Sequence, residues 1–241
     1  MGKSKDLATR VGIDDNADAT AITITSQENV GIGTSSPSNY GTTYTSLGVS
    51  GSSASAIEGF VGSTLVGYMQ SYNGQVLVGS KTNVPLKLVT NDTVQMTIDG
   101  SGYVKTPNLP AFHAKGLGNT SSAGGTANGN EVLLFNGITY NNGSHYNAST
   151  GRFTAPCAGI YYFSYSLLYD NSFNNAGSAM LRRNASGAGE YGYVEGNSAD
   201  YLQVSASAVV SCSTGDYVDV YSYPAGWHIA SESSFTGFMI G

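Results

Sequence analysis

A series of spaced aromatic, asparagine and glycine positions between residues 135 and 163 predicts that this chain folds into β-strands. Its last residues alternate as Gly-Ile-Tyr-Tyr-Phe, so that Tyr161 and Phe163 lie two positions apart. Because residues two apart share one face of a strand, this alternation predicts a strand with one aromatic face. The dipeptide Asn142-Gly143 predicts a type I′ hairpin turn that pairs the Phe135 and Tyr146 runs. Pro156 lacks an N–H, which indicates a strand edge or a corner.

The complete spacing comprises Phe135, Asn141, Tyr146, Phe153, Gly159, Tyr161 and Phe163, and it resembles the signature of the C1q-like domain. That domain is a trimeric jelly roll shared with the tumour-necrosis-factor ligands. Residues 111–114, 215–218 and 234–238 resemble other strands of the same family. The resemblance covers residues 108–241 and implies a ten-stranded, two-sheet jelly-roll head that forms a homotrimer. Core or trimer packing is expected at Phe112, Phe135, Tyr146, Phe153, Gly159, Tyr161, Phe163, Tyr165, Phe235 and Phe238.

The first part of the chain is also rich in β signals, but its strands are short. Asn73-Gly74 predicts a hairpin, and apolar residues alternate with polar ones from Leu86 to Ile98. Strands of this length with little core are marginal in isolation, whereas three copies around one axis could bury their apolar faces together. Residues 21–107 are therefore expected to form a trimeric β-rich shaft or collar, and the fold class of the whole chain is all-β.

Two segments of this first part resemble bacteriophage fibre proteins. The phrase Asn-Val-Gly-Ile-Gly-Thr-Ser-Ser-Pro at residues 29–37 resembles one that recurs in tail fibres, and residues 83–104 resemble segments that precede fibre heads. Residues 1–20 carry much of the local charge without periodicity, which is compatible with a virion-attachment arm or with a frayed end.

Composition narrows the function further. The net charge of -6 and the low content of charged residues, 11%, argue against nucleic-acid binding, which requires clustered Lys and Arg. No apolar run reaches the length of a membrane span, and no secretion leader follows Met1, so neither membrane insertion nor classical secretion is expected. We expect synthesis in a host cytoplasm.

Catalytic and metal-binding patterns are weak. His113, His145 and His228 have no Asp or Cys spacing that suggests a triad or a zinc site, so an enzyme and a cofactor are not expected. Some members of the resembled family bind calcium, but Asp170 and Asp200 match no such motif. The two cysteines, Cys157 and Cys212, are expected to be free core thiols, although a disulfide stays open.

These observations favour a trimeric bacteriophage tail fibre or spike whose head attaches to the host surface. The alternatives are a capsid decoration or head fibre, and a free C1q-like lectin or adhesion module. Contact with a host glycan or protein is expected at Tyr223, Trp227 and His228, because Trp227 is the sole tryptophan and lies in a Pro/Gly loop. The opposing interpretation is that Trp227 folds back to fill the end of the barrel.

Overall fold

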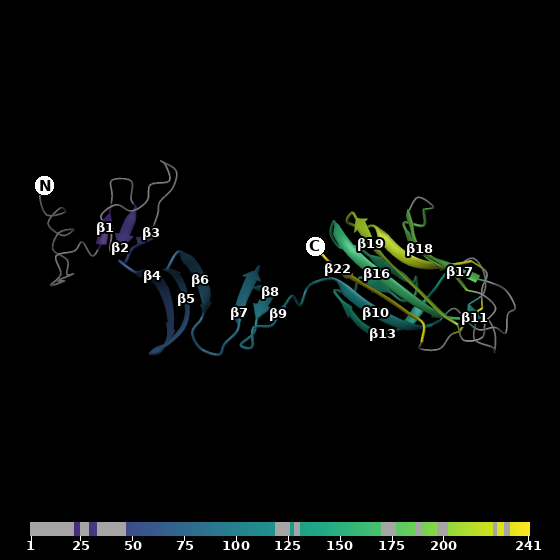
Figure 1. The fold of residues 1–241 in the computed structure, drawn as a ribbon, viewed down its shortest axis with the longest axis horizontal. Helices are drawn as coiled ribbons and strands as arrows, with labels where there is room; N and C mark the ends of the chain where they lie inside the picture. The colour runs from purple at the N-terminus through teal and green to yellow at the C-terminus, as the bar shows by residue number, and fades with distance from the viewer. Residues whose placement is uncertain are drawn as a thin grey trace, which may run out of the picture. The chain divides into compact units, whose positions relative to one another are not determined.

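The computed structural model divides the chain into two compact units, Met1–Lys105 and Thr106–Gly241. Figure 1 shows the strands of each unit. The structure describes residues 22–24, 29–32, 47–118, 126–127, 131–169, 177–186, 189–196, 202–223, 226–228 and 232–241. The predicted attachment arm, residues 1–20, lies outside this set.

The described part of the first unit consists of three small sheets with three strands each. The first sheet contains β1 (Ile22–Ile24), β2 (Val30–Ile32) and β3 (Leu47–Val49). The second contains β4 (Ala54–Val61), β5 (Thr64–Tyr72) and β6 (Gln75–Ser80), and the third contains β7 (Leu86–Thr90), β8 (Thr93–Ile98) and β9 (Val104–Lys105). The predicted hairpin at Asn73-Gly74 is confirmed: β5 pairs with β6, and the two turn residues have φ angles of 48° and 75°. A type I′ turn requires this left-handed backbone at both positions.

The second unit, which we call the head, is a jelly roll with thirteen strands among its described residues. The strands are β10 (Ala111–Leu117), β11 (Thr126–Ala127), β12 (Glu131–Val132), β13 (Phe135–Asn142), β14 (Tyr146–Asn147), β15 (Arg152–Thr154), β16 (Gly159–Leu168), β17 (Gly177–Arg183), β18 (Glu190–Gly196), β19 (Gln203–Cys212), β20 (Tyr217–Ser222), β21 (Trp227–His228) and β22 (Ser234–Met239). Ten strands were expected; four of the thirteen are only two residues long, too short to leave a periodic sequence signal.

Two large antiparallel sheets form the head, and β11 and β21 add a small two-stranded sheet. The first sheet has the strand order β13-β10-β22-β16-β19, and the second has the order β14-β15-β20-β17-β18, with β12 added against β20. Neighbours within a sheet are mostly distant in sequence, as in the long pairings of β16 with β19 and of β10 with β22. Among the described residues, no helix is long and apolar enough to cross a membrane.

The core between the sheets is aromatic. Phe112 stacks on Tyr146 with ring centroids 4.6 Å apart, lies 5.3 Å from Phe153 and meets Phe235 edge-on at 4.8 Å. Phe163 of the first sheet lies 5.4 Å from Phe153 of the second sheet. The predicted core residues that the structure buries are Phe112, Phe135, Tyr146, Phe153, Tyr161, Phe163, Tyr165 and Phe235.

The hairpin predicted at Asn142-Gly143 is wrong. β13, which contains Phe135, pairs with β10 in the first sheet, whereas β14, which contains Tyr146, pairs with β15 in the second sheet. The turn therefore carries the chain from one sheet to the other. Asn141 stabilises this corner, because its side chain donates to the Tyr146 carbonyl at 2.8 Å and accepts from the Tyr146 N–H at 3.1 Å. These side-chain bonds replace the backbone ladder of a hairpin.

Candidate functional site

The outward face of the first sheet changes character along its strands. At the end nearest the C-terminus, the pairing registers place Ala111, Phe238, Tyr162 and Val209 in one row across four strands, with Ile160 and Ile240 in the adjacent row. Toward the other end the corresponding positions are polar and include Ser164, Ser166, Ser205, Ser207 and Ser234. We call the six apolar residues of the first two rows the apolar band.

The apolar band is exposed in a single chain. Four of its six residues are exposed, Phe238 at 41%, Val209 at 60%, Ile240 at 56% and Ile160 at 40%, while Ala111 and Tyr162 are half-buried. The rings of Tyr162 and Phe238 lie 5.2 Å apart. Phe238 was expected to pack either in the core or in a trimer contact. The prediction of a core position is wrong, because Phe238 lies on the outward face of β22 while its neighbour Gly237 faces inward. Neighbouring exposed apolar side chains on one face are typical of an interface rather than of a solvated surface.

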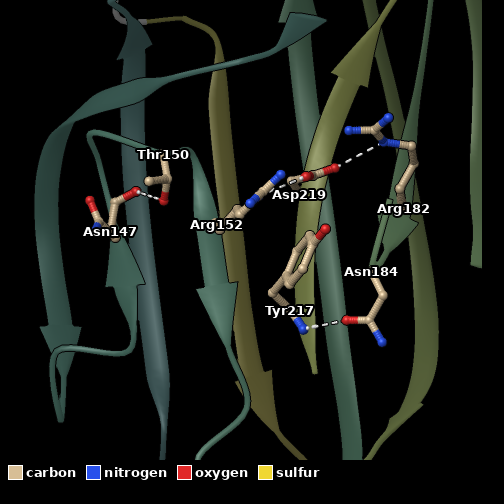
Figure 2. A network of polar contacts seen from close by, with 7 residues as sticks. All are labelled: Asn147, Thr150, Arg152, Arg182, Asn184, Tyr217 and Asp219. Atoms are coloured by element: carbon tan, nitrogen blue, oxygen red, sulfur yellow. Dashed lines mark hydrogen bonds and ion pairs between the residues drawn. The ribbon is translucent and has the colours of Figure 1, made fainter. Parts of the chain in front are cut away.

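A second group of functional interest lies on the outward face of the second sheet. Three strands place Arg152 of β15, Asp219 of β20 and Arg182 of β17 directly opposite one another in the register. Figure 2 shows the Asp219 carboxylate between the two guanidinium groups. The distances are 3.3 Å from Arg152 Nε to Oδ2 and 3.0 Å from Arg182 Nε to Oδ1. We call these three residues the arginine row.

Tyrosine rings on the same strand hold both guanidinium groups. Tyr217 and Tyr221 flank Asp219 two residues to each side, so all three side chains point outward from β20. The Cζ atom of Arg152 lies 4.1 Å from the centre of the Tyr217 ring, and that of Arg182 lies 3.6 Å from the centre of the Tyr221 ring. Asp219 is fully buried, whereas the side chains of Arg182 and Arg152 are 12% and 38% exposed. The arginine row was not predicted, because its members are far apart in sequence and only the register brings them together; the alternation Tyr-Val-Asp-Val-Tyr from residue 217 is the one signal that places Asp219 outward.

The structure contradicts the prediction that Trp227 contacts a ligand. Its ring is fully buried, donates from Nε1 to Ser222 Oγ at 2.7 Å and meets the Tyr169 ring edge-on at 5.9 Å. The alternative interpretation, in which the tryptophan fills the end of the barrel, agrees with this position. The pairing of β21 with β11 holds the residue there.

The two residues predicted to act with Trp227 remain closer to the surface. Tyr223 is 38% exposed, and its ring meets that of Tyr221 edge-on at 5.4 Å. His228 is half-buried. Their roles in binding stay predictions, but Tyr223 is the one that the structure brings near the arginine row.

Gly159 is half-buried at the start of β16, and a Cβ atom there would lie 2.7 Å from Met239 Cε and 2.9 Å from the Gly241 carbonyl oxygen. The cysteines are both free: Cys212 is buried, as expected, but Cys157 is exposed, because it follows the Pro156 corner rather than lying within a strand. Burial raises the pKa of the Cys212 thiol to about 11, and burial also raises the pKa values of the Tyr146 and Tyr165 hydroxyls.

Within the described residues, no cluster of three His, Cys, Asp or Glu side chains could hold a metal ion. Asp170 and Asp200, the acidic residues considered for calcium, lie outside the described residues. His113 Nδ1 lies 3.0 Å from Thr139 Oγ1, and its ring lies beside that of Tyr140. His145 lies edge-on to Phe153.

Comparison with known proteins gives a consistent set of relatives for the head. A family model described as the C1q domain matches residues 111–240. Mouse complement C1q tumor necrosis factor-related protein 7 is 30% identical over 113 residues, which is 45% of this chain and 38% of the relative. Rat complement C1q tumor necrosis factor-related protein 5 is 28% identical over 115 residues, which is 45% of each chain. The matched segments span less than half the length of these relatives.

Two solved structures are similar as well. The globular domain of zebrafish complement 1qA protein has a TM-score of 0.43 at 18% identity and covers 55% of this chain and 98% of its own. Murine APRIL at pH 8.0 has a TM-score of 0.41 at 17% identity and covers 54% of this chain and 96% of its own.

These relatives correct the predicted localisation. The chain was expected in a virion, but the similar curated proteins are complement C1q tumor necrosis factor-related proteins of mouse, rat and human. The curated relatives named here are thus mammalian proteins and not virion proteins.

Proposed function

Because this chain belongs to the C1q domain family through residues 111–240, we propose that its head is a homotrimeric binding module without enzymatic activity. The observation that carries this proposal is the apolar band, which lies on one face of the first sheet and has four of its six residues solvent-exposed in a single chain. Burying it against two further copies would remove this apolar surface from water, which is the dominant favourable term in protein association. Cyclic symmetry closes such an assembly and prevents open-ended association.

The change from apolar to polar side chains along the outward face of the first sheet supports a threefold contact at its apolar end. The apolar rows can pack tightly, whereas the rows of serine side chains toward the other end tolerate water. Interfaces commonly combine an apolar centre with a polar, wetter margin. The second sheet then faces away from the symmetry axis and remains available for a ligand.

The first unit fits the same assembly. Its described strands leave many apolar side chains exposed, among them Val61 at 72% and Val76 at 76%. Small sheets whose apolar side chains stay exposed bury too little surface to be stable alone. We therefore extend the proposal to residues 21–107, as a β-rich shaft or collar in which three chains cover one another, followed by the C1q-like jelly roll at residues 108–241.

A charge placed in the apolar band tests the assembly. Phe238→Asp should convert the trimer into monomers, because three carboxylates would have to be buried together without partners. Tyr193→Asp is the matched control, since Tyr193 is an exposed aromatic residue of the second sheet (59% exposed). Light scattering of the full chain measures the mass of each variant. A trimeric Phe238→Asp variant, or a monomeric Tyr193→Asp variant, would contradict the proposed interface.

A further inference from the structure

The arginine row has the geometry of an anion-binding site whose donors are incompletely used. A guanidinium that serves only to neutralise a carboxylate usually presents two parallel N–H groups to it. Here each arginine contacts Asp219 through Nε alone. The Nη groups of Arg152 and Arg182 donate to no other residue in the described part of the head. Two planar donor groups are thus held close together, and their Nη edges have no acceptor among the described residues of the head.

The surroundings keep these donors in place before any ligand arrives. Asp219 is buried and restrains both side chains through its two oxygens, while the rings of Tyr217 and Tyr221 cover one face of each guanidinium plane. Cation–π contacts of this kind restrict the rotation of an arginine. The donors are therefore already ordered in the free protein. Binding then loses less side-chain conformational entropy, which favours affinity.

The local charge suits an anion although the chain as a whole is acidic. Two guanidinium groups share one carboxylate, so the row keeps an excess positive charge. The opposite neighbour of Arg182 on β18 is Glu190, which is exposed; no ion pair within the described residues joins the two. On the other side the neighbour of Arg152 is the uncharged Asn147. The site is therefore open toward Asn147 and bounded by negative charge at Glu190.

The nature of the surface favours a sugar over an apolar protein segment. The large hydrophobic side chains that are exposed on the described strands of the second sheet, or directly after them, are two tyrosines, Tyr193 and Tyr223. Tyr223 continues the outward row of Asp219 and Tyr221, and its ring touches that of Tyr221. Tyrosine offers a flat apolar area with a polar edge, which suits a sugar ring, whereas protein anchors require an apolar pocket.

We propose that the arginine row binds the oxyanion of an acidic saccharide, a carboxylate or a sulfate, with Tyr223 against the adjoining sugar ring. This inference rests on the proposal that the head is a binding module. It is independent of the trimer, because one chain supplies every residue of the site. Three copies per assembly would raise the avidity for a polyvalent glycan.

Calorimetric titration of the full chain tests the site with three soluble oligosaccharides of equal length. These are a sulfated heparin fragment, an oligogalacturonate with carboxylates only, and a neutral malto-oligosaccharide. We expect binding of one or both acidic probes and none of the neutral one; the acidic probe that binds identifies the anion. Absence of binding by both acidic probes, or equal binding of the neutral one, would overturn the proposal. Binding of a polyglutamate peptide as tight as that of the saccharides would refute the saccharide class.

Variants assign the binding to these residues. Arg152→Gln should weaken the affinity by about tenfold or more, since hydrogen bonds to charged groups contribute about 1.5–3 kcal/mol. Arg152→Lys should not restore it, because lysine keeps the charge but loses the planar fork. Arg183→Gln is the matched control: it removes the same charge from the same sheet, but Arg183 bonds to the Ser211 carbonyl instead. An equal loss of affinity in the Arg183→Gln variant would show that binding depends only on the overall charge, and this would contradict the proposed site.

A variant that is expected to bind more tightly separates a true effect on the site from a loss of binding caused by misfolding. Glu190→Gln removes a like charge from an exposed position and should tighten the binding of the acidic probe; unchanged or weaker binding would count against the site. Sedimentation of the same samples reports the mass. A trimer that binds no acidic saccharide refutes this inference alone, whereas a monomer that binds one refutes the trimer alone.

Discussion

The hydroxyl of Tyr146 joins the two sheets of the head by bonding to both polar backbone atoms of Phe135. It donates to the Phe135 carbonyl at 3.0 Å and accepts from the Phe135 N–H at 3.2 Å, and both residues are buried. Phe135 belongs to β13 in the first sheet and Tyr146 to β14 in the second. The fixed spacing between these two positions thus reflects a connection between sheets, with the Asn141 corner between them.

Tyr146→Phe should lower the free energy of unfolding by about 1–3 kcal/mol. The substitution keeps the ring that stacks on Phe112 but leaves the Phe135 N–H and carbonyl buried without a partner. Urea denaturation measures the effect, with Tyr193→Phe as the control at an exposed ring. Equal stability of the two variants would show that the bond does not hold the sheets together.

Gly237→Ala should destabilise the head by about 1–3 kcal/mol through overpacking. In the register, Gly237 lies between Phe112 and Phe163. A Cβ atom there would lie 2.6 Å from Phe163 Cε1 and 2.8 Å from Phe112 Cε1. Gly241→Ala serves as the control, because a Cβ at that position meets nothing within 4 Å. A melting temperature that is equal in both variants would contradict the tight fit of the two rings.

Trp227→Ala should cost about 3–5 kcal/mol of stability, as expected for truncation of a large buried ring. The indole is fully buried and bonded to Ser222. Thermal melting and saccharide binding are to be measured on the same variant. An unchanged melting curve together with lost binding would restore the recognition role that the sequence indicated.

Alkaline pH should weaken the head. Burial raises the pKa of Cys212 from its ordinary value of 9.0 to about 11. As the pH rises through this interval, the unfolded chain has released the thiol proton while the folded chain still holds it, so the free energy of unfolding falls. Urea denaturation between pH 8 and 11 measures how steeply the free energy of unfolding falls with pH. The Cys212→Ala variant should show a shallower fall, whatever its stability at pH 8. Identical slopes would indicate that the thiol does not contribute.

The sequence predicted the core better than the surface. The alternation of Tyr161, Phe163 and Tyr165 correctly identified one buried strand face, because burial follows the two-residue period of a strand whatever its partner. Residues 111–114, which resemble a strand of the C1q-like family, lie within β10 (Ala111–Leu117). The Asn142-Gly143 hairpin failed because local turn propensity does not reveal which sheet the next strand joins.

The surface depends on long-range pairing, which a single sequence does not specify. Arg152 and Arg182 meet only because β15 and β17 both pair with β20 at Asp219. Trp227 lies in a segment whose Pro and Gly residues indicate a loop, yet the bridge to Tyr169 and the pairing with β11 bury its ring. Phe238 follows the two-residue alternation of its strand, but that alternation does not show which face of the strand points toward the core.

Sedimentation equilibrium of the unmodified full chain at micromolar concentration is the decisive measurement for the proposed trimer. We expect a single species with three times the chain mass of 24.9 kDa, because in the proposed assembly two further copies would cover the apolar band and the exposed strands of the first unit. A stable species with the mass of one chain would contradict the trimer.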